Sequence, residues 1–249
     1  MPVKSTGASA GLTSGAVNQS VWTWSVYHVN NGTPLAKVTV GASWGWPANP
    51  MAPIPAGAHA THDSDAEIVV INDTTGQTFD FWGFANSNGT YSANAYGESN
   101  IFTGTGFGST HPSLGAGTRA IGASGLGGLI LGADLAAATI NHGIAIELPY
   151  SYLAGGPMAP AIGSDATGGT GHIQEGERLA IPAGTPKPSN LTPEGSKVWD
   201  ALVKYGGIIA DKDSGSPVFQ MEAITTTPAQ ATNLRKDAAT IMKALATAS

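Results

Sequence analysis

The chain contains no cysteine, which excludes disulfide bridges and thiolate metal sites. Charged residues are also scarce: they make up 11% of the 249 residues, about half of the usual share. The 11 lysines and arginines are scattered and are outnumbered by 17 acidic residues, so no basic stripe is available for a phosphate backbone. We therefore do not expect a nucleic-acid partner.

Long apolar runs are missing as well. No stretch approaches the roughly 18 apolar residues that span a bilayer, so we expect no membrane span. Residues 1–19 are small and polar and lack the apolar segment of a secretory signal, which predicts a flexible N-terminal arm. An extracellular or virion location remains compatible with this arm, because a virion protein released by lysis needs no signal peptide.

Apolar residues, at 41%, and six tryptophans are enough for an ordinary core, and 34 glycines and 16 prolines punctuate many short segments. These segments predict the following strands: Val21–Val29, Lys37–Val40, Glu67–Asn72, Thr78–Phe84, Thr90–Tyr96, Gly143–Leu148, Arg178–Ile181, Gly207–Asp211 and Pro217–Met221. The turn sequences NDTTGQ and NSNGT predict two hairpins, and thus a three-stranded meander from Glu67 to Tyr96.

Three segments have helical patterns. Leu191–Tyr205 and Thr227–Ala246 combine an N-cap threonine, a following proline and apolar residues at helical spacing, and Gly132–Ala138 predicts a shorter turn. Many strands and few helices favour a mainly β fold, namely a single jelly-roll-like antiparallel β-sandwich with two or three peripheral helices. We expect an arm at 1–19, the sandwich at 20–226, and a C-terminal helix packing on it at 227–249.

One acidic and aromatic cluster, HATHDSDAEIVVINDTTGQTFDFWGF at residues 59–84, stands out in this weakly charged chain. In an extended strand Asp65 and Glu67 share one face with their Cα atoms roughly 6.5 Å apart, and Asp80 and Trp82 share a face of the next strand. Two carboxylates at this spacing can approach the roughly 5–5.5 Å of retaining glycosidases, and a tryptophan beside carboxylates is typical of a sugar platform. The cluster therefore predicts a glycan-binding face, with Asp65 and Glu67 as candidate catalytic acids.

Simpler interpretations of the same cluster stay open. An aspartate-rich strand start is often only a capped turn, and a tryptophan such as Trp82 is often a core residue. His59, His62 and Asp63 lack an established metal-binding spacing, although calcium binding through aspartate oxygens is an alternative. We expect no metal and no cofactor.

Polar residues further along the chain extend the candidate site. His142 follows a glycine-rich segment and stands in phase with a buried strand, where it is a candidate catalytic residue or an ordinary core histidine. Asp165 and His172 bracket a glycine-rich loop that predicts a flexible lip and are candidate ligand-binding residues. No Gly-x-Ser-x-Gly elbow supports serine catalysis.

The order of four blocks resembles a group of uncharacterised β-rich proteins: secreted proteins of actinobacteria and tail-associated proteins of their phages. The blocks are PIPAGAHATHDSDAEIVVINDTTGQTFDFWGF, ASGLGGLILGADLAAATINHGIAIELP, EGERLAIP and LTPEGSKVWDALVKYGGIIADKDSGSPVFQMEA, and they cover roughly residues 53–223. In the group, Gly-His follows the first Ser-Asp, whereas this chain has Ala66-Glu67. The resemblance implies an extracellular or virion setting, no particular reaction, and a shared face formed by these residues: Asp65, Asp80, Trp82, His142 and Asp213.

Two hypotheses of function follow, and a third is simpler. We favour a glycan-recognition module that binds cell-wall polysaccharide, for example on a phage tail or a cell surface. The alternative is a glycoside-cleaving enzyme with Asp65 and Glu67 or Asp80 as its carboxylate pair. The third hypothesis is a structural virion subunit that contacts other copies of itself or other virion proteins.

Overall fold

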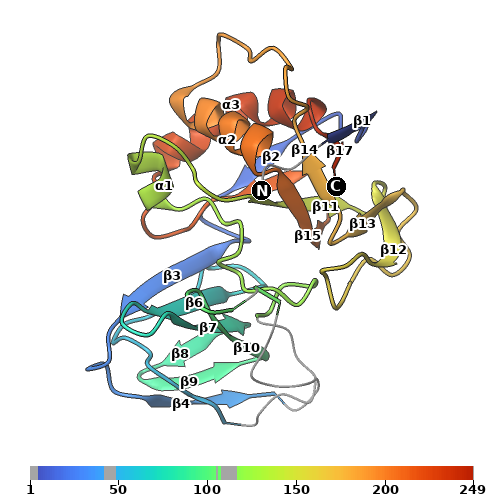
Figure 1. Cartoon of the computed structure of the whole chain (residues 1–249). Helices are drawn as coiled ribbons and strands as arrows, with labels where there is room; N and C mark the ends of the chain where they lie inside the picture. Colours follow the sequence, from blue (N-terminus) through green and yellow to red (C-terminus); the bar gives the residue numbers. More distant parts are fainter. Residues whose placement is uncertain (1–4, 42–48, 105, 108–116, 249) are drawn as a thin grey trace. The chain divides into compact units, whose positions relative to one another are not determined.

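The computed structural model describes residues 5–41, 49–104, 106–107 and 117–248, and it is mainly β, with 34% strand and 15% helix (Figure 1). The mainly β prediction is thereby confirmed. Residue contacts divide the chain into two compact units, here called unit 1 (Met1–Gln19 with Gly128–Ser249) and unit 2 (Ser20–Gly127). This division differs from the single sandwich domain that we expected, because the N-terminal residues join the C-terminal half.

Unit 2 consists of two four-stranded sheets that share one core. The first has the order β10-β7-β6-β3 and the second the order β5-β4-β9-β8. Their bounds are β3 Trp24–Val29, β4 Ala36–Val40, β5 Met51–Ala52, β6 Glu67–Asn72, β7 Gln77–Trp82, β8 Ala85–Ser87, β9 Thr90–Ala93 and β10 Ala95–Asn100. Every second residue of β6 and β7, such as Val70 and Phe79, packs with Val38 and Val40 from β4, so alternation along the strands creates the shared core.

The hairpin predicted at NDTTGQ is confirmed, with β6 and β7 antiparallel and Val69 opposite Asp80. The predicted three-stranded meander is wrong. Segment Thr90–Tyr96 is split between β9, which pairs with β8 and β4, and β10, which returns to pair with β7. Asn94 separates the two strands, so this one segment contributes a strand to each of the two sheets.

The expectation of purely antiparallel sheets is also wrong. Parallel pairs join β3 to β6 and β4 to β9 in unit 2, and further parallel pairs occur in unit 1. The strand spacing resembled that of an antiparallel fold, but long connections allow a chain to return in parallel. The connection from β3 to β6, for example, contains β4 and β5 of the other sheet.

Unit 1 is built on a seven-stranded mixed sheet with the order β1-β17-β14-β15-β11-β16-β2, beside a small sheet of β12 and β13. The bounds are β1 Ser5–Ser9, β2 Ala16–Asn18, β11 Ile144–Pro149, β12 Leu153–Pro157, β13 Ile173–Glu175, β14 Arg178–Ala180, β15 Gly207–Asp213, β16 Val218–Gln220 and β17 Ala246–Ala248. Strand β11 lies inside the sheet and pairs in parallel with β15. All six of its residues are buried, as expected for a strand covered on both faces.

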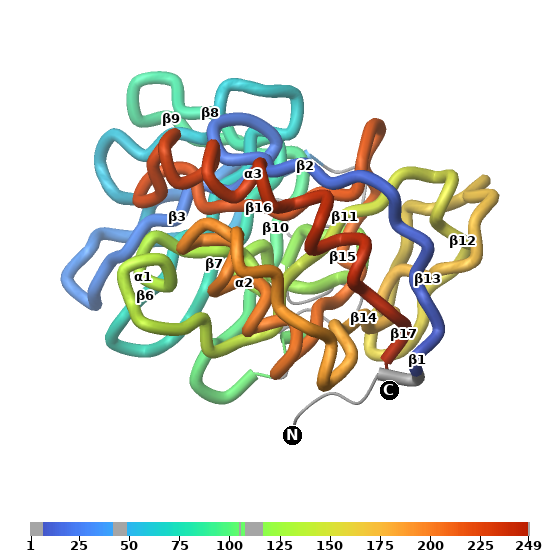
Figure 2. The backbone as a smooth tube through the Cα atoms, turned by 90° about the horizontal axis from the view of Figure 1, so that it is seen from above, coloured from blue at the N-terminus to red at the C-terminus, as the bar shows by residue number. Residues whose placement is uncertain are grey.

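The N-terminal segment is not a mobile arm as we expected. Residues 1–4 lie outside the described residues, but β1 pairs with β17 and β2 pairs with β16, so both ends of the chain meet in one sheet (Figure 2). Ala10, Leu12 and Val17 are buried in the core of unit 1. These few apolar residues anchor the segment to the core. The small polar residues around them explain why the sequence pattern did not predict strands there.

Three helices belong to unit 1: α1 Gly132–Ala136, α2 Pro193–Lys204 and α3 Pro228–Lys243. The side chains of Thr192 and Thr227 cap α2 and α3 as predicted, and both helices lie on the same side of the large sheet (Figure 1). Helix α3 ends earlier than predicted because the following residues form β17. Trp199 packs inward from α2 and is 3% exposed.

Candidate functional site

The predicted shared face of β6 and β7 exists. Val69 of β6 lies opposite Asp80 of β7. Side chains two residues apart in a strand share a face, so Glu67 and Trp82 lie on the same side of the sheet as this pair. Asp65 does not join them in the predicted way. Ala66 adopts a positive φ of 46°, which interrupts the extended chain between Asp65 and Glu67. The catalytic pair expected from strand alternation is therefore not formed by the strand.

Asp80 is fully buried on this face, so it is not an accessible ligand-binding residue. Its carboxylate accepts hydrogen bonds from the Ser124 hydroxyl at 2.9 Å and the Gly125 N–H at 2.5 Å. Burial raises the pKa of Asp80 to about 7, although these two hydrogen bonds and the charge of Arg119 favour its ionised form. The expectation that Asp80 presents an open carboxylate is wrong, because the loop around Ser124 covers it.

The covering loop fits closely over the sheet. The Arg119 guanidinium donates to the Gly125 carbonyl at 3.0 Å and lies 5.6 Å from the centroid of the Trp24 ring. A Cβ atom at Gly125 would lie 2.3 Å from Trp24, so only glycine allows this approach. This loop covers Asp80 and Trp24, whereas Glu67, the register partner of Trp24, and Trp82 are only half-buried.

An open pocket of about 540 Å³ lies at the start of the same cluster, in unit 2. Its lining residues combine imidazole, amide, carboxylate and aromatic groups and include His59, His62, Asp63, Phe84 and Asn86. The two histidines are exposed, and their rings lie nearly parallel, with centroids 6.4 Å apart. The pocket lies in the segment that the sequence singled out, but its lining contains the two histidines and not Asp80.

Asp63 organises one side of this pocket, here called the histidine pocket. One carboxylate oxygen accepts the N–H groups of Asp65 and Ala66 at 2.8 and 2.9 Å, and the other accepts the N–H of Trp22 at 2.8 Å. Partial burial tends to raise the pKa of Asp63, but these hydrogen bonds and one from Thr61 outweigh it and hold the pKa below its ordinary value. Asp63 is therefore an ionised anchor and not a general acid.

Trp22 is the most exposed tryptophan among the described residues, with 51% of its surface accessible. It has a positive φ of 50°, which is uncommon for a bulky residue, and its N–H is held by Asp63 of the pocket lining. Trp22 falls inside the predicted strand Val21–Val29, but β3 begins only at Trp24. Backbone strain and exposure together make Trp22 a functional candidate that the sequence pattern did not reveal.

His59 is held in a defined orientation. The Tyr27 hydroxyl accepts the His59 N–H and donates to the His59 carbonyl, both at 2.9 Å. The ring nitrogen Nδ1 lies 3.2 Å from the Ala60 carbonyl, which can only accept, so Nδ1 carries the proton. In the neutral ring, Nε2 is then an acceptor directed away from this bond. Such an acceptor suits a hydroxyl donor from a ligand.

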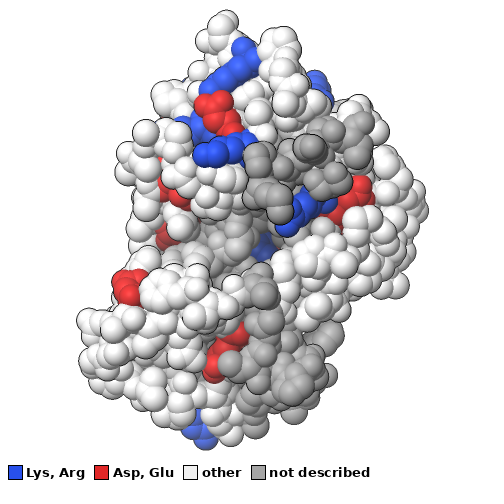
Figure 3. Space-filling model, in the orientation of Figure 1, with Lys and Arg blue, Asp and Glu red and all other residues white. Residues whose placement is uncertain are grey.

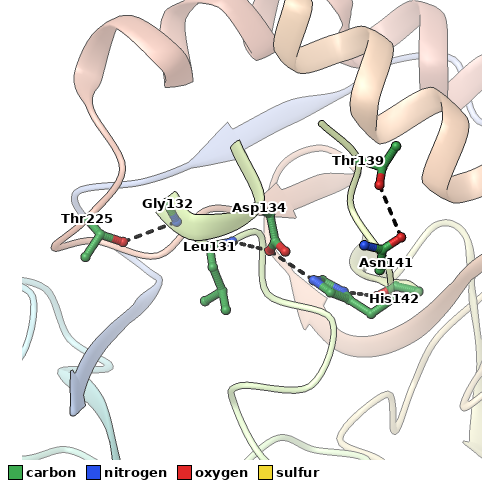
Figure 4. A network of polar contacts seen from close by, with 8 residues as sticks. Leu131, Gly132, Asp134, Thr139, Asn141, His142 and Thr225 are labelled. Carbon is green, nitrogen blue, oxygen red and sulfur yellow. Dashed lines mark hydrogen bonds and ion pairs between the residues drawn. The ribbon is translucent and has the colours of Figure 1, made fainter. Parts of the chain in front are cut away.

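His142 belongs to unit 1, whereas Asp65 and Glu67 belong to unit 2. Its Nε2 lies 3.0 Å from Asp134 and its Nδ1 lies 2.9 Å from the Gly143 carbonyl (Figure 4). Burial lowers the pKa of His142, but the hydrogen bonds to Asp134 and Gly143 outweigh it and raise the pKa above the ordinary value. Because both nitrogens face acceptors, His142 is held as a donor of two hydrogen bonds, which does not suit a general base.

Of the other predicted residues of unit 1, Asp213 lines a second pocket, Asp165 contacts Lys212 of its lining, and His172 does not belong to the lining. Lys212 is paired with Asp165 at 2.9 Å, and the N–H of Asp165 donates to the buried carboxylate of Glu175 at 3.0 Å. Burial and the neighbouring Asp165 raise the pKa of Glu175 to about 8. Asp213 lines this pocket, and His172 is exposed on the segment that leads into β13.

None of the helices in the described part of the chain has the length and apolarity to cross a bilayer. Within the described ranges, no group of three or more histidines and carboxylates is arranged to hold a metal ion. On the face of the molecule drawn in Figure 3, several basic side chains lie close together beside an acidic one, and others lie apart from them. Comparison with known proteins found no matching family model, no similar curated protein and no similar solved structure.

Proposed function

We propose that the protein is a glycan-recognition module and that unit 2 is its sandwich-type binding part. The observation that carries this proposal is the exposed Trp22, whose backbone is anchored to a polar pocket by Asp63. An exposed indole offers an apolar surface for the C–H face of a sugar, and the pocket offers acceptors for hydroxyl groups. The predicted ligand class is retained, but its site moves from Asp80 to the histidine pocket.

The chemistry of the histidine pocket supports binding better than cleavage. A glycosidase needs a protonated carboxylic acid and an ionised carboxylate on the two sides of the scissile bond. Asp63, the carboxylate of the pocket lining, already accepts three backbone hydrogen bonds and has a lowered pKa. It is thus a poor proton donor, whereas the Nε2 atom of His59 is suited to hydrogen bonding with a sugar hydroxyl.

One observation favours cleavage as a second candidate function. In unit 1, Asp165 is ion-paired with Lys212 and lies beside Glu175, whose pKa is raised by burial to about 8, so that Glu175 can hold a proton near neutral pH. Glu175, however, is 0% exposed and cannot touch a substrate in this structure. Product analysis of a polysaccharide incubated with the wild-type chain and with Asp165→Asn tests this candidate, which requires products from the first and none from the second.

The expected ligand is a cell-wall polysaccharide, because the candidate face combines acidic and aromatic groups. The resemblance of the sequence blocks implies only the extracellular or virion setting. A glycan array and a pull-down with isolated cell walls should identify a saccharide that the protein retains. Trp22→Ala should weaken binding by about 1–3 kcal/mol, because a tryptophan buries a large apolar surface on a ligand. Leu35→Ala is the matched control, since Leu35 is an exposed apolar residue of the same unit outside the pocket, and it should bind normally.

A structural virion subunit is the outcome that would replace this proposal. In that case the array and the cell walls would retain nothing, and the purified chain would assemble with itself or with other virion proteins. Retention that is unchanged in Trp22→Ala would contradict the assignment of the histidine pocket.

A further inference from the structure

A second pocket, of about 400 Å³, lies in unit 1 where two neighbouring parallel strands end. Strand β11 ends at Pro149 and β15 ends at Asp213, and these two residues are partners in the parallel register. The segments that follow the two strands, Tyr150–Ser151 and Ser214–Gly215, complete the lining. The carboxyl ends of parallel strands are the usual position of ligand sites in open sheets.

Charged groups hold the aromatic side of this pocket in place. The Lys212 ammonium lies 2.9 Å from Asp165 and 5.3 Å from the centroid of the Tyr150 ring. The segment that carries Asp165 is fixed in turn by the hydrogen bond of its N–H to Glu175, which is fully buried. Tyr150 is thus positioned by its neighbours while 40% of its surface stays exposed. A preorganised aromatic ring reduces the entropy that a ligand must overcome.

Several polar groups of the pocket have no partner among the described residues. Asp213 uses only Oδ1, which accepts the N–H groups of Gly215 and Ser216 at 2.6 and 3.1 Å. No hydrogen-bond partner in the described part of the chain contacts the Oδ2 atom of Asp213 or the hydroxyl groups of Ser151 and Ser214. These groups provide one strong acceptor and two donor-acceptors, and the only cation of the lining, Lys212, is already paired with Asp165.

We propose that this pocket binds a neutral sugar residue, which lies on the ring of Tyr150 and donates a hydroxyl hydrogen bond to Asp213. The volume is sufficient for a small ligand, since ligand pockets start at roughly 300 Å³. Binding of a free anion is disfavoured, because the positive charge of Lys212 is already paired with Asp165 and Asp213 adds a negative charge. The ligand class rests on the proposed function, but the position of this site, in unit 1, is independent of the histidine pocket in unit 2.

The test is a titration of the whole chain with four neutral tetrasaccharides: cellotetraose, maltotetraose, chitotetraose and mannotetraose. Isothermal titration calorimetry should give two sites per chain for at least one of them. Tyr150→Ala should weaken one site by about tenfold or more, through loss of the stacking surface, and Trp22→Ala should weaken the other. Asp213→Asn should weaken the Tyr150 site because the amide keeps Oδ1 but loses the charged acceptor. Ile224→Ala, an exposed apolar residue of unit 1 outside the pocket, is the control.

The outcomes separate this inference from the proposed function. If Trp22→Ala removes all binding and Tyr150→Ala changes nothing, the inference is overturned while the histidine pocket stands. If Tyr150→Ala removes all binding and Trp22→Ala changes nothing, the pocket of unit 1 is supported and the assignment to the histidine pocket fails. Binding of none of the four probes, or equal binding by Tyr150→Ala and Ile224→Ala, overturns the inference. Circular dichroism of each variant identifies a loss of binding that results from unfolding.

Discussion

Replacing Asp80 by alanine separates a structural carboxylate from a ligand-binding one. Asp80 is 0% exposed and accepts hydrogen bonds from the Ser124 hydroxyl and the Gly125 N–H. The substitution leaves both donors buried without an acceptor, at a cost of about 1–3 kcal/mol each. We therefore expect the free energy of unfolding of unit 2 to fall by about 2–6 kcal/mol at pH 5, where the carboxyl group of the folded protein is protonated.

The pH dependence has a defined sign. The pKa of Asp80 is about 7 in the folded protein, above its ordinary value of 3.8, so the folded state holds the proton more tightly than the unfolded state. The contribution of this group to stability is complete below about pH 4, is lost as the pH rises towards 7, and is about 2–3 kcal/mol smaller at pH 8 than at pH 5. The destabilisation by Asp80→Ala should therefore be smaller at pH 8 than at pH 5.

Hydrogen exchange of the backbone amides of β6 and β7 is the appropriate assay, because it reports the opening of unit 2 separately from that of unit 1. Asp80→Asn is the matched variant. It keeps one acceptor, so it should lose less stability than the alanine variant, and it cannot ionise, so it should lack this pH dependence. A loss below about 1 kcal/mol for Asp80→Ala, combined with weaker glycan binding, would refute the structural role and restore Asp80 to the binding face.

Three other substitutions test the core and the polar network. Trp199→Ala should lower the free energy of unfolding of unit 1 by about 3–5 kcal/mol, measured by urea denaturation, because Trp199 is 3% exposed. Gly125→Ala should lower the melting temperature, since its Cβ would lie 2.3 Å from the Trp24 ring. Asp134→Asn should lower the pKa of His142 in an NMR titration, because Asp134 contributes to raising it. The stability that His142 contributes is complete below its unfolded pKa near 6.5 and is lost as pH rises through the higher folded value.

Each of these expectations has a contrary result. If Trp199→Ala lowers the free energy of unfolding by less than about 1 kcal/mol, as is usual for an exposed residue, the side chain lies outside the core. Gly155→Ala is the control for Gly125→Ala, because a Cβ there meets nothing within 4 Å, and equal effects of the two substitutions would remove the steric argument. An unchanged pKa of His142 in Asp134→Asn would mean that the 3.0 Å contact does not form in solution.

Local patterns predicted much of the secondary structure. The strand Glu67–Asn72 and its hairpin partner were predictable because two apolar runs flank a turn-forming sequence, and α2 because Thr192 and a proline mark its start. The parallel pairs were not predictable in this way, because they join segments that are far apart in the chain. The pairing of β1 with β17 is of the same kind, since no local signal links the two ends of the chain.

The candidate site shows the same division between local and distant information. Strand alternation correctly placed Glu67, Asp80 and Trp82 on one face. It could not show that the loop carrying Ser124 covers Asp80, because this contact joins residues 44 positions apart. Nor could it reveal Trp22, whose exposure depends on a positive φ and on Asp63. The residues near the acidic cluster were thus identifiable from the sequence, but their accessibility was not.

The histidine pocket of unit 2 is the site at which we propose that a saccharide binds. The most direct test is a titration of the 15N-labelled chain with a retained saccharide, followed through the indole N–H signals of the tryptophans. Trp24 and Trp199 are buried and serve as internal references, whereas Trp22 is half-exposed beside the pocket. Binding at the histidine pocket should produce a saturable shift of the Trp22 signal, with little change at Trp24 and Trp199. Saccharide binding that leaves the Trp22 signal unchanged would contradict binding at this pocket.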